Sequence, residues 1–462
     1  MNLKLDEVGS LLQSFFEPEI VEQKARETKF VQRVSKLTGL MFLKAMVFGC
    51  LEHPRASLNQ LAQSCLDLGL EISVQSFDER INEHSVAFME SMFVEAMTFF
   101  RNKQPLPLAI LQQFTAINLF DSSFMSLPAA LAAEYPGSGG NASPASLKVQ
   151  LGFDFLHGNL IDLALRPGTE ADQKYEAHLA LMQPGSLNIS DLGYFKLDHL
   201  QQVGQRKAYF LSRYLPKTAL LKPQGQPIDL LPYLRSQPKV PFEISVLLGQ
   251  SPKHQIPCRL IVLPLPQQVA DRRRQKAKEN AKRLRKSWSK EYLALLDWVI
   301  FVTNVPQAML CLEQIAHLYR VRWQIELLFK LAKSYCGLRY LGQWRRDRIL
   351  TELYARLIGL ILTCFLISPI RMPCATQANR ELSPVQVRKI FQRFVRTINL
   401  VLPNSDTLLP VLNEMFCHIL HFGFKTKRKL KPNICHALHL AFALHSLSLP
   451  LDDHAYLHPL LT

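Results

Sequence analysis

Residues 319 to 333 constrain this chain more than any other segment. On an α-helix of about 100° per residue, the polar side chains fall within an arc of roughly 80°, and apolar side chains cover most of the rest. The polar stripe consists of Tyr319, Arg322, Glu326, Lys330 and Lys333. This pattern predicts a largely buried helix with one carboxylate among cations. Such a stripe suits a metal ion beside a phosphate, because the acid can hold the metal while the cations hold phosphate oxygens.

A plainer interpretation of the same stripe is a solvated ladder of ion pairs. Arg322, Glu326 and Lys330 are four residues apart, the spacing at which each pair stabilises a helix by a few tenths of a kcal/mol. The stripe alone does not separate the two interpretations. Two acids upstream, described below, favour the metal site.

The charge balance points to a polyanionic partner. The chain has 462 residues and a formal net charge of +16, a basic excess typical of proteins that bind nucleic acid or an anionic membrane. The longest apolar run, residues 357 to 370, is too short to cross a bilayer and predicts a buried core helix. The charged first residues predict no signal peptide, and nine scattered cysteines predict a reduced protein. We therefore expect a cytoplasmic, nucleoid-associated protein with DNA as its partner and no membrane.

The first part of the chain, residues 1 to 105, reads as a helical DNA-binding domain. Ser57 and Ser73 are each placed to cap a helix. Two short helices about a turn apart resemble a helix-turn-helix, whose second helix would enter the major groove. A plain helical bundle would show the same pattern, so both interpretations stay open here.

Strand patterns begin near residue 106 and predict an α/β region. Apolar residues 114 to 120 and 187 to 190 predict strands, and strict alternation over 147 to 155 and 161 to 165 predicts a hairpin. Residues 171 to 182 read as helical. We assign 106–214 and 301–345 to two parts of one catalytic core, and 346–462 to a helical C-terminal region that could dimerise.

The region from 215 to 300 interrupts this core with a β-rich and basic insertion. Strands are predicted over 242 to 248 and 259 to 263. Ten Lys or Arg lie between 272 and 290, which is denser than solubility requires and favours phosphate contacts. The DNA-contact candidates are Arg272, Arg273, Arg274, Lys282, Arg283, Arg285 and Lys286.

Two acids follow predicted strands, and a third lies on the striped helix. Asp121 and Asp191 each come directly after an apolar strand, where a rigid sheet can hold a carboxylate open to solvent. Together with Glu326 they would hold two Mg²⁺ or Mn²⁺ ions. One ion would activate a water or a 3′-hydroxyl, and the other would stabilise the leaving oxygen of an in-line phosphoryl transfer.

These motifs resemble those of a known family. The spacing Tyr319-x2-Arg322-x3-Glu326-x6-Lys333 matches the YREK motif of DDE transposases carried by prokaryotic insertion sequences. Asp121-Ser122-Ser123 is similar to the first-aspartate motif of that family, and Asp191-Leu192-Gly193-Tyr194-Phe195 is similar to the second. The resemblance covers roughly residues 40 to 340.

The resemblance implies a ribonuclease-H-like mixed-sheet core with a β-rich insertion. It implies cut-and-paste transposition through a DNA hairpin, with metal held by Asp121, Asp191 and Glu326. Phosphates near the cleaved end would be contacted by Tyr319, Arg322, Lys330 and Lys333. Trp298 aligns with a tryptophan that stacks on a displaced base in relatives, although a core role suits it equally. The N-terminal helices would bind the terminal inverted repeats, target DNA would bind as well, and a dimer would pair two ends in the synaptic complex.

Two other functions fit the same residues. A structure-specific nuclease of this fold would cut DNA or RNA without strand transfer, but it would need neither a helix-turn-helix nor a long basic insertion. A catalytically silent DNA-binding derivative would be marked by the loss of an acid, and all three acids are present.

Overall fold

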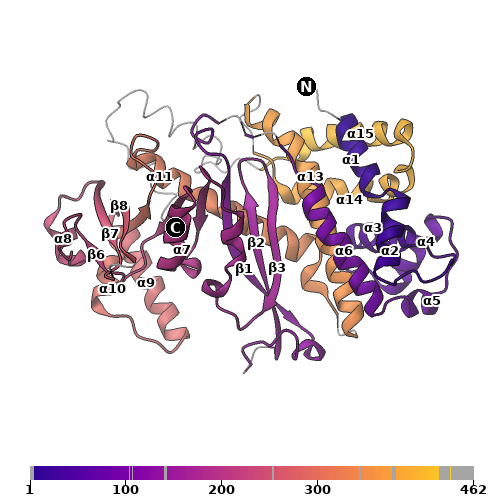
Figure 1. Ribbon diagram of the computed structural model, residues 1–462, viewed down its shortest axis with the longest axis horizontal. Coiled ribbons are helices and arrows are strands. Elements are labelled where there is room, and N and C mark those ends of the chain that lie inside the picture. The colour runs from indigo at the N-terminus through magenta and orange to yellow at the C-terminus, as the bar shows by residue number, and fades with distance from the viewer. Residues whose placement is uncertain are drawn as a thin grey trace. The chain divides into compact units, whose positions relative to one another are not determined.

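The computed structural model describes residues 5–103, 105–106, 108–139, 143–251, 254–342, 345–376, 381–425 and 438 (Figure 1). The chain divides into two compact units. The first, here called the helical unit, comprises Met1–Pro107, Ser122–Glu170 and Gln324–Lys427. The second, the sheet unit, consists mainly of Leu108–Asp121 and Ala171–Trp323. Neither unit is a single stretch of chain.

The helical unit is organised around the long helix α13 (Arg346–Thr376), which packs on α3, α6 and α14. The remaining α-helices of this unit are α1 (Leu5–Phe15), α2 (Pro18–Glu27), α3 (Gly39–Glu52), α4 (Leu58–Asp67), α5 (Val74–Glu79), α6 (Glu83–Phe99), α12 (Trp323–Lys330), α14 (Pro384–Val401) and α15 (Ser405–Phe422). An antiparallel hairpin, β2 (Ala145–Asp154) and β3 (Asn159–Pro167), belongs to the same unit.

Helix α13 contains the apolar run seen in the sequence. The stretch Arg346–Arg371 is long and apolar enough to cross a membrane, but 94% of its most apolar window is buried inside the protein. The prediction that residues 357 to 370 form a buried core helix is therefore confirmed. Residues 348 to 356, which precede the apolar run, are buried as well, and the helix begins at Arg346.

The N-terminal helices begin where the sequence places their caps. The side chain of Ser57 accepts a hydrogen bond from the backbone N–H of Gln60 and completes a capping box at the start of α4. Ser73 caps α5 in the same way through Ser76. Both helices agree with the prediction, and α4 packs on α5. Each cap satisfies backbone N–H groups that an isolated helix leaves unpaired.

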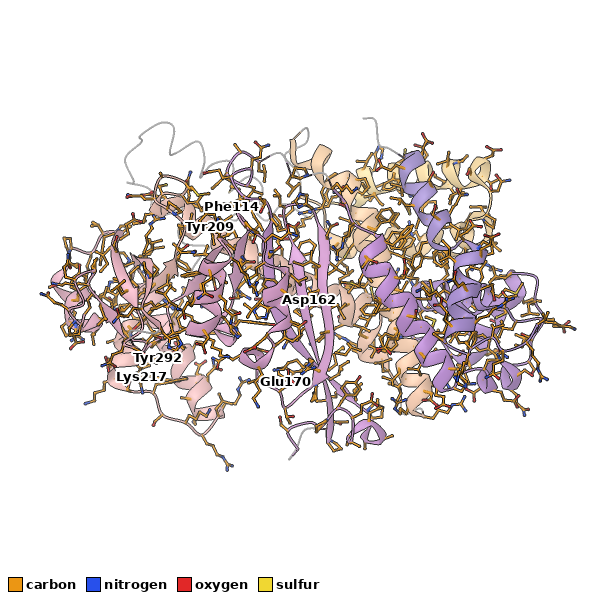
Figure 2. All side chains as sticks on the ribbon, viewed as in Figure 1. Phe114, Asp162, Glu170, Tyr209, Lys217 and Tyr292 are labelled. Carbon is orange, nitrogen blue, oxygen red and sulfur yellow. The ribbon has the colours of Figure 1, made fainter. Side chains whose placement is uncertain are left out.

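The sheet unit is built on strands in the order β1-β4-β5-β9-β8-β7-β6. These strands are β1 (Ile117–Leu127, which continues into the helical unit), β4 (Leu187–Ser190), β5 (Tyr209–Arg213), β6 (Leu220–Leu221), β7 (Phe242–Leu248), β8 (Ile256–Pro264) and β9 (Trp298–Thr303). Its α-helices are α7 (Leu197–Gln205), α8 (Leu230–Ser236), α9 (Gln267–Arg283), α10 (Lys290–Leu295) and α11 (Leu312–Tyr319). Phe114, just before β1, packs edge-on against Tyr209 with ring centroids 5.9 Å apart (Figure 2).

Strand direction confirms the predicted α/β class with a mixed sheet. β4 runs parallel to both β1 and β5, the arrangement that a ribonuclease-H-like core requires. β9 is antiparallel to β5 on one side and to β8 on the other. The strands of the predicted insertion, β7 and β8, therefore continue the sheet of the core. This continuation is possible because β9 is buried along almost its whole length and has partners on both edges.

Two local predictions differ from the structure. Residues 171 to 182 form two short 3₁₀ turns, Asp172–Lys174 and Ala177–Leu181, in place of a helix. Tyr175 between them is extended and its ring stacks on His178, so side-chain packing overrides the helical pattern. Strand β1 is also longer than predicted, because alternating burial continues through Met125 and Leu127. Asp121 thus lies within β1 and not after its end.

Candidate active site

Asp121 and Asp191 come from two neighbouring parallel strands of the sheet unit. The last paired residues of β1 and β4 are Phe120 and Ser190. Each aspartate is the next residue of the chain, Asp121 inside β1 and Asp191 directly after the end of β4. Neighbouring strands lie about 4.8 Å apart. The two acids, 70 residues apart in the sequence, therefore occupy equivalent positions where the pairing of β1 with β4 ends.

Arg322 reaches the first of these acids. Its Nη1 lies 3.2 Å from Oδ2 of Asp121, and each side chain is 17% exposed. A ligand can therefore reach the pair. The partial burial also restricts the motion of both side chains. Arg322 lies in a 3₁₀ turn, Arg320–Arg322, that directly follows α11. The segment with the predicted polar stripe therefore places the guanidinium of Arg322 beside the carboxylate of Asp121.

Tyr319 lies in the same cluster and is almost fully buried. Its ring centroid is 4.9 Å from that of Phe301 on β9, and the guanidinium of Arg213 lies 5.6 Å from it. Burial raises the pKa of Tyr319, an effect opposed by the positive charges of Arg213 and Arg322. The phenol therefore remains a hydrogen-bond donor at neutral pH, which suits contact with a phosphate oxygen. Arg213 was not predicted, since one arginine at the end of a strand has no distinguishing pattern.

A second carboxylate beside Asp191 also escaped prediction. Asp191 caps a 3₁₀ turn, Leu192–Tyr194, by accepting a hydrogen bond from the backbone N–H of Gly193. A Cβ atom at residue 193 would lie 2.9 Å from Oδ2 of Asp172 and 3.0 Å from Oδ1 of Asp191. A side chain at residue 193 would therefore require these carboxylate oxygens to shift by a few tenths of an ångström. The position of Asp172 beside Asp191 depends on a loop that the Asp191-Leu192-Gly193 motif does not include.

Glu326 belongs to the helical unit, on α12 one turn after Arg322 along the chain. It is half-buried. The helical run from 319 to 335 is not a uniform α-helix, because it opens with the 3₁₀ turn at Arg320–Arg322 and closes with a π turn at Leu331–Tyr335. The predicted 80° arc assumed ideal α-helical geometry. That all three acids meet at one point stays a prediction.

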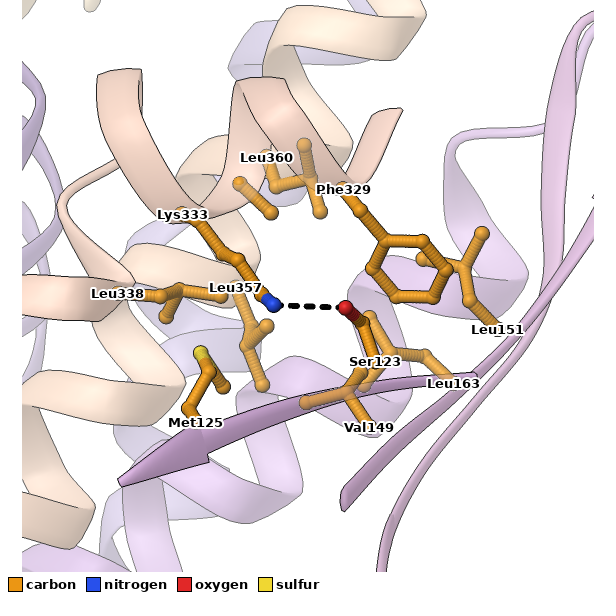
Figure 3. Close-up of a pocket in the computed structure, with 11 residues that line it drawn as sticks. Ser123, Met125, Val149, Leu151, Leu163, Phe329, Lys333, Leu338, Leu357 and Leu360 are labelled. Atoms are coloured by element: carbon orange, nitrogen blue, oxygen red, sulfur yellow. Dashed lines mark hydrogen bonds between the residues drawn. The ribbon is translucent and has the colours of Figure 1, made fainter. Parts of the chain in front are cut away.

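Lys333 lies in the π turn and is held inside the helical unit. Its Nζ donates a hydrogen bond of 2.6 Å to Oγ of Ser123 (Figure 3). Apolar side chains surround this bond, namely Met125, Val149, Leu151, Leu163, Phe329, Leu338, Leu357 and Leu360. Burial, helped by the charge of Arg339, lowers the pKa of Lys333. Ser123, the third residue of the first-aspartate motif, thus accepts a bond from Lys333 that the motif alone did not reveal. Lys330, by contrast, is exposed to solvent.

The donor set suits a hard divalent cation, but the described residues do not form a complete cage. Within the parts of the chain that the structure describes, no three His, Cys, Asp or Glu side chains lie close enough together to hold one metal ion. Asp121 is paired with Arg322, and Glu326 lies in the other unit. Carboxylate oxygens at the equivalent positions of β1 and β4 nevertheless fit Mg²⁺ or Mn²⁺ chemically.

The basic run lies on α9 and in the turn after it. Most of its cations are exposed, including Arg272, Lys282, Arg283, Arg285 and Lys286. Arg273 is different, because its Nη1 donates to the carbonyls of Leu296 and Trp298 and burial lowers its pKa to about 10. Arg274 pairs with Asp271 and Asp297. These two arginines hold α9 against the start of β9, so they are poor candidates for DNA contact.

Trp298 opens β9 and pairs with Pro264. It is half-buried, and its carbonyl accepts the bond from Arg273. The structure therefore gives it a place in the sheet. Its predicted role in base stacking stays untested.

The burial of His178 makes the stability of the sheet unit depend on pH. Its ring packs against Phe120 and Tyr194, the neighbours of the two aspartate motifs, and burial lowers its pKa from 6.5 to about 4. Between these values the unfolded chain binds the proton and the folded chain does not, so stability falls as the pH drops from 6.5 towards 4, by up to about 1.4 kcal/mol per pH unit. Denaturant unfolding at several pH values should show a shallower fall for His178→Phe. An unchanged slope would contradict this.

Comparison with known proteins finds related sequences along most of the chain. A family model described as a transposase DDE domain matches residues 112–362, more than half of the chain. The transposase for insertion sequence element IS231F of Bacillus thuringiensis subsp. israelensis is 27% identical over 454 residues, covering 92% of this chain and 93% of that protein. The transposase for insertion sequence element IS1151 of Clostridium perfringens is 25% identical, covering 95% and 97%.

Among solved structures, a piggyBac transposase synaptic complex with hairpin DNA aligns with a TM-score of 0.45 and 12% identity. The alignment covers 96% of this chain and 85% of that one. The family model and the full-length relatives confirm the predicted resemblance to transposases of prokaryotic insertion sequences. The chain belongs to the family of DDE transposases.

Proposed function

We propose that this transposase cleaves DNA at the ends of an insertion sequence and joins those ends to target DNA, with a divalent metal as cofactor. The observation that carries the proposal is the placement of Asp121 and Asp191 at equivalent positions of two parallel strands, with Arg322 bonded to the first. Two carboxylates held by a sheet beside a cation suit a reaction at a phosphodiester.

Asp121, Asp191 and Glu326 would hold the metal, with two ions of Mg²⁺ or Mn²⁺ as the expected complement. When bound, the ions would supply charge stabilisation to the attacking and leaving oxygens of an in-line displacement. The sheet fixes both aspartates in place, because β1 and β4 are paired up to the residue before each acid. The backbone N–H of Gly193 donates a hydrogen bond to the carboxylate of Asp191.

The remaining motif residues would hold the DNA backbone. Arg322 offers a planar guanidinium that can bind two phosphate oxygens at once. Tyr319 offers a neutral phenol, and Lys330 an exposed ammonium. Lys333 differs, because its ammonium is partly desolvated and already bonded to the hydroxyl of Ser123. Binding a phosphate in place of that hydroxyl would give the ammonium a negatively charged partner.

The pathway would be cut-and-paste with a hairpin at the transposon end, in which Trp298 is the candidate for stacking on a displaced base. The N-terminal helices, with α4 and α5 as the helix-turn-helix candidate, would bind the terminal inverted repeats. A dimer would pair two ends in the synaptic complex. The reaction would take place in the cytoplasm, on the nucleoid.

A strand-transfer assay tests the function. The full chain is incubated with Mg²⁺, a labelled duplex carrying one end of the element, and a plasmid target. Nicked, hairpin and joined products support the full proposal, and joined product without a hairpin would exclude the hairpin pathway. Cleavage without any joined product would instead favour a structure-specific nuclease, and DNA binding without cleavage a silent derivative.

Salt dependence of duplex binding tests the role of the basic run. Replacing Lys282, Arg283 and Lys286 together by Gln should reduce the slope of log K against log salt by about 2 to 3, because each phosphate contact releases about 0.9 counterions. The matched control replaces Lys222, Arg235 and Lys239, three exposed cations of the same unit outside the run. Equal changes for both triple variants would show that only net charge matters. Fluorescence anisotropy over a salt series gives both slopes.

A further inference from the structure

We propose that the turn between α9 and α10 in the sheet unit is a binding site for an unpaired DNA base, which stacks on Trp288. The inference rests on the proposed function only in taking DNA as the partner. It concerns an aromatic residue ten positions before Trp298, in a region where the sequence indicated cations alone.

An aromatic pair is fixed on this turn. The rings of Trp288 and Tyr292 stack with centroids 4.4 Å apart and planes 27° apart. Nε1 of Trp288 donates a 3.1 Å hydrogen bond to the carbonyl of Ala277 on α9. Ser289 caps α10 by accepting from the backbone N–H of Tyr292, which anchors the second ring. The indole is therefore held by contacts from both helices.

The same indole is open to solvent. Trp288 is 40% exposed although it is the largest side chain of the turn. Apolar surface left in water forgoes the stabilisation that burial would bring. A tryptophan that served only to close the turn would bury more of its surface. A rigid, partly exposed ring is instead a surface on which a planar ligand can stack with little loss of side-chain freedom.

The charges near Trp288 in the sequence are mostly positive. Exposed cations on both sides of it are Lys282, Arg283, Arg285, Lys286 and Lys290, and the nearest acids, Glu279 and Glu291, flank this stretch. Phosphates supply the matching charge, and every nucleic-acid base supplies an aromatic face. Bases in a duplex are stacked on their neighbours and present only their edges. An indole can therefore stack on a base only where the strand is unpaired.

The site is thus a combination of two known elements of single-strand binding, a cationic path for the backbone and an aromatic ring for a base. Sequence-tolerant stacking would hold a strand that separates during cleavage or joining. Trp298, half-buried at the start of β9, lies outside this turn and does not share its exposure.

The test compares two DNA probes and three variants of the full chain. The probes are a labelled oligothymidylate of about 20 nucleotides, long enough for one site, and a labelled duplex of equal length. Trp288→Leu removes the aromatic face and keeps an apolar side chain, while Trp288→Phe keeps an aromatic face. Leu284→Ala is the matched control, because Leu284 is an exposed apolar residue of the same turn, at 53% exposure. Equal thermal unfolding midpoints establish that each variant is folded.

Trp288→Leu should weaken oligothymidylate binding by about 5- to 150-fold at fixed salt, as expected for the loss of one stacked base. Duplex binding should change by less than about twofold, and the salt slope should stay the same, because no charge is removed. Trp288→Phe should recover most of the loss, and Leu284→Ala should behave as the unaltered chain.

Equal losses on both probes, an unchanged affinity of Trp288→Leu for the single strand, or an equal loss with Leu284→Ala would each overturn the inference. The strand-transfer assay on the unaltered chain separates this failure from that of the proposed function. Active strand transfer without aromatic dependence overturns the stacking site alone. Aromatic-dependent single-strand binding without strand transfer overturns the proposed function and supports the stacking site.

Discussion

Asp121→Asn, Asp191→Asn and Glu326→Gln are each expected to lower the rate of DNA cleavage by at least about a thousandfold. Loss of a carboxylate that holds a metal ion removes several kcal/mol of transition-state stabilisation, and each 1.36 kcal/mol is a factor of ten in rate. Binding of the transposon end should persist, because removing a negative charge near a phosphate does not weaken attraction to DNA. Single-turnover cleavage and anisotropy measure the two effects separately.

Asp198→Asn is the matched control for these variants. Asp198 lies on α7 in the same unit, seven residues after Asp191, and its carboxylate pairs with His254. It should cleave within about twofold of the unaltered chain, since surface ion pairs contribute little. Substantial cleavage by any of the three variants would remove that acid from the proposed site.

A cysteine at position 121 separates metal binding from a purely structural role. A thiolate binds softer transition metals better than Mg²⁺, so Asp121→Cys should recover part of its activity in Mn²⁺ and remain inactive in Mg²⁺. A residue that merely held Arg322 in place would show no such dependence on the metal. Equal activity in both ions would show that Asp121 is not a metal ligand.

Glu352→Leu is expected to produce the largest loss of stability, roughly 3–5 kcal/mol. Glu352 lies inside α13 and is 1% exposed. Its carboxylate accepts hydrogen bonds from Nε of Arg348 at 3.0 Å and from Nη2 of Arg356 at 2.8 Å. Both arginines are buried as well. Removing the carboxylate takes a buried negative charge away from two buried cations, which is far costlier than losing a surface pair.

Urea unfolding of the full chain, monitored by the helical signal, measures this loss. Glu352→Gln keeps a hydrogen-bond acceptor and loses only the charge, so it should fall between the unaltered chain and Glu352→Leu. Arg396→Ala is the contrasting variant, because the Arg396–Asp67 pair is on the surface and should contribute about 0–1 kcal/mol. A loss below about 1 kcal/mol for Glu352→Leu would show that the buried network is not needed for stability.

The sequence predicted those features that depend on neighbours along the chain. β4 begins and ends at the predicted residues, β7 does so as well, and α4 starts after the predicted cap at Ser57. Alternation, apolar runs and caps act over a few residues, so they can be read without knowing the fold. The motif spacing also indicated the family, which the family model over residues 112–362 confirms.

Some residues of the same type have different roles for reasons that the sequence does not contain. Arg273 and Arg283 belong to one basic run, but Arg273 is half-buried and bonded to carbonyls at the start of β9, while Arg283 faces solvent. Arg356 borders an apolar run and looks like its charged end. It is nevertheless among the most buried side chains, and its terminal nitrogens donate hydrogen bonds to Glu352 and to the carbonyl of Gly337.

What the sequence by itself determined is the family, the strands and helices with strong periodicity, and the identity of the candidate acids. Only the tertiary structure placed Asp121 level with Asp191, brought Arg322 to the first acid and Asp172 near the second, and gave Lys333 its bond to Ser123. The reason is physical. Periodicity and capping follow from interactions within a few residues, whereas burial and ion pairing join residues tens to hundreds of positions apart and exist only once the chain has packed.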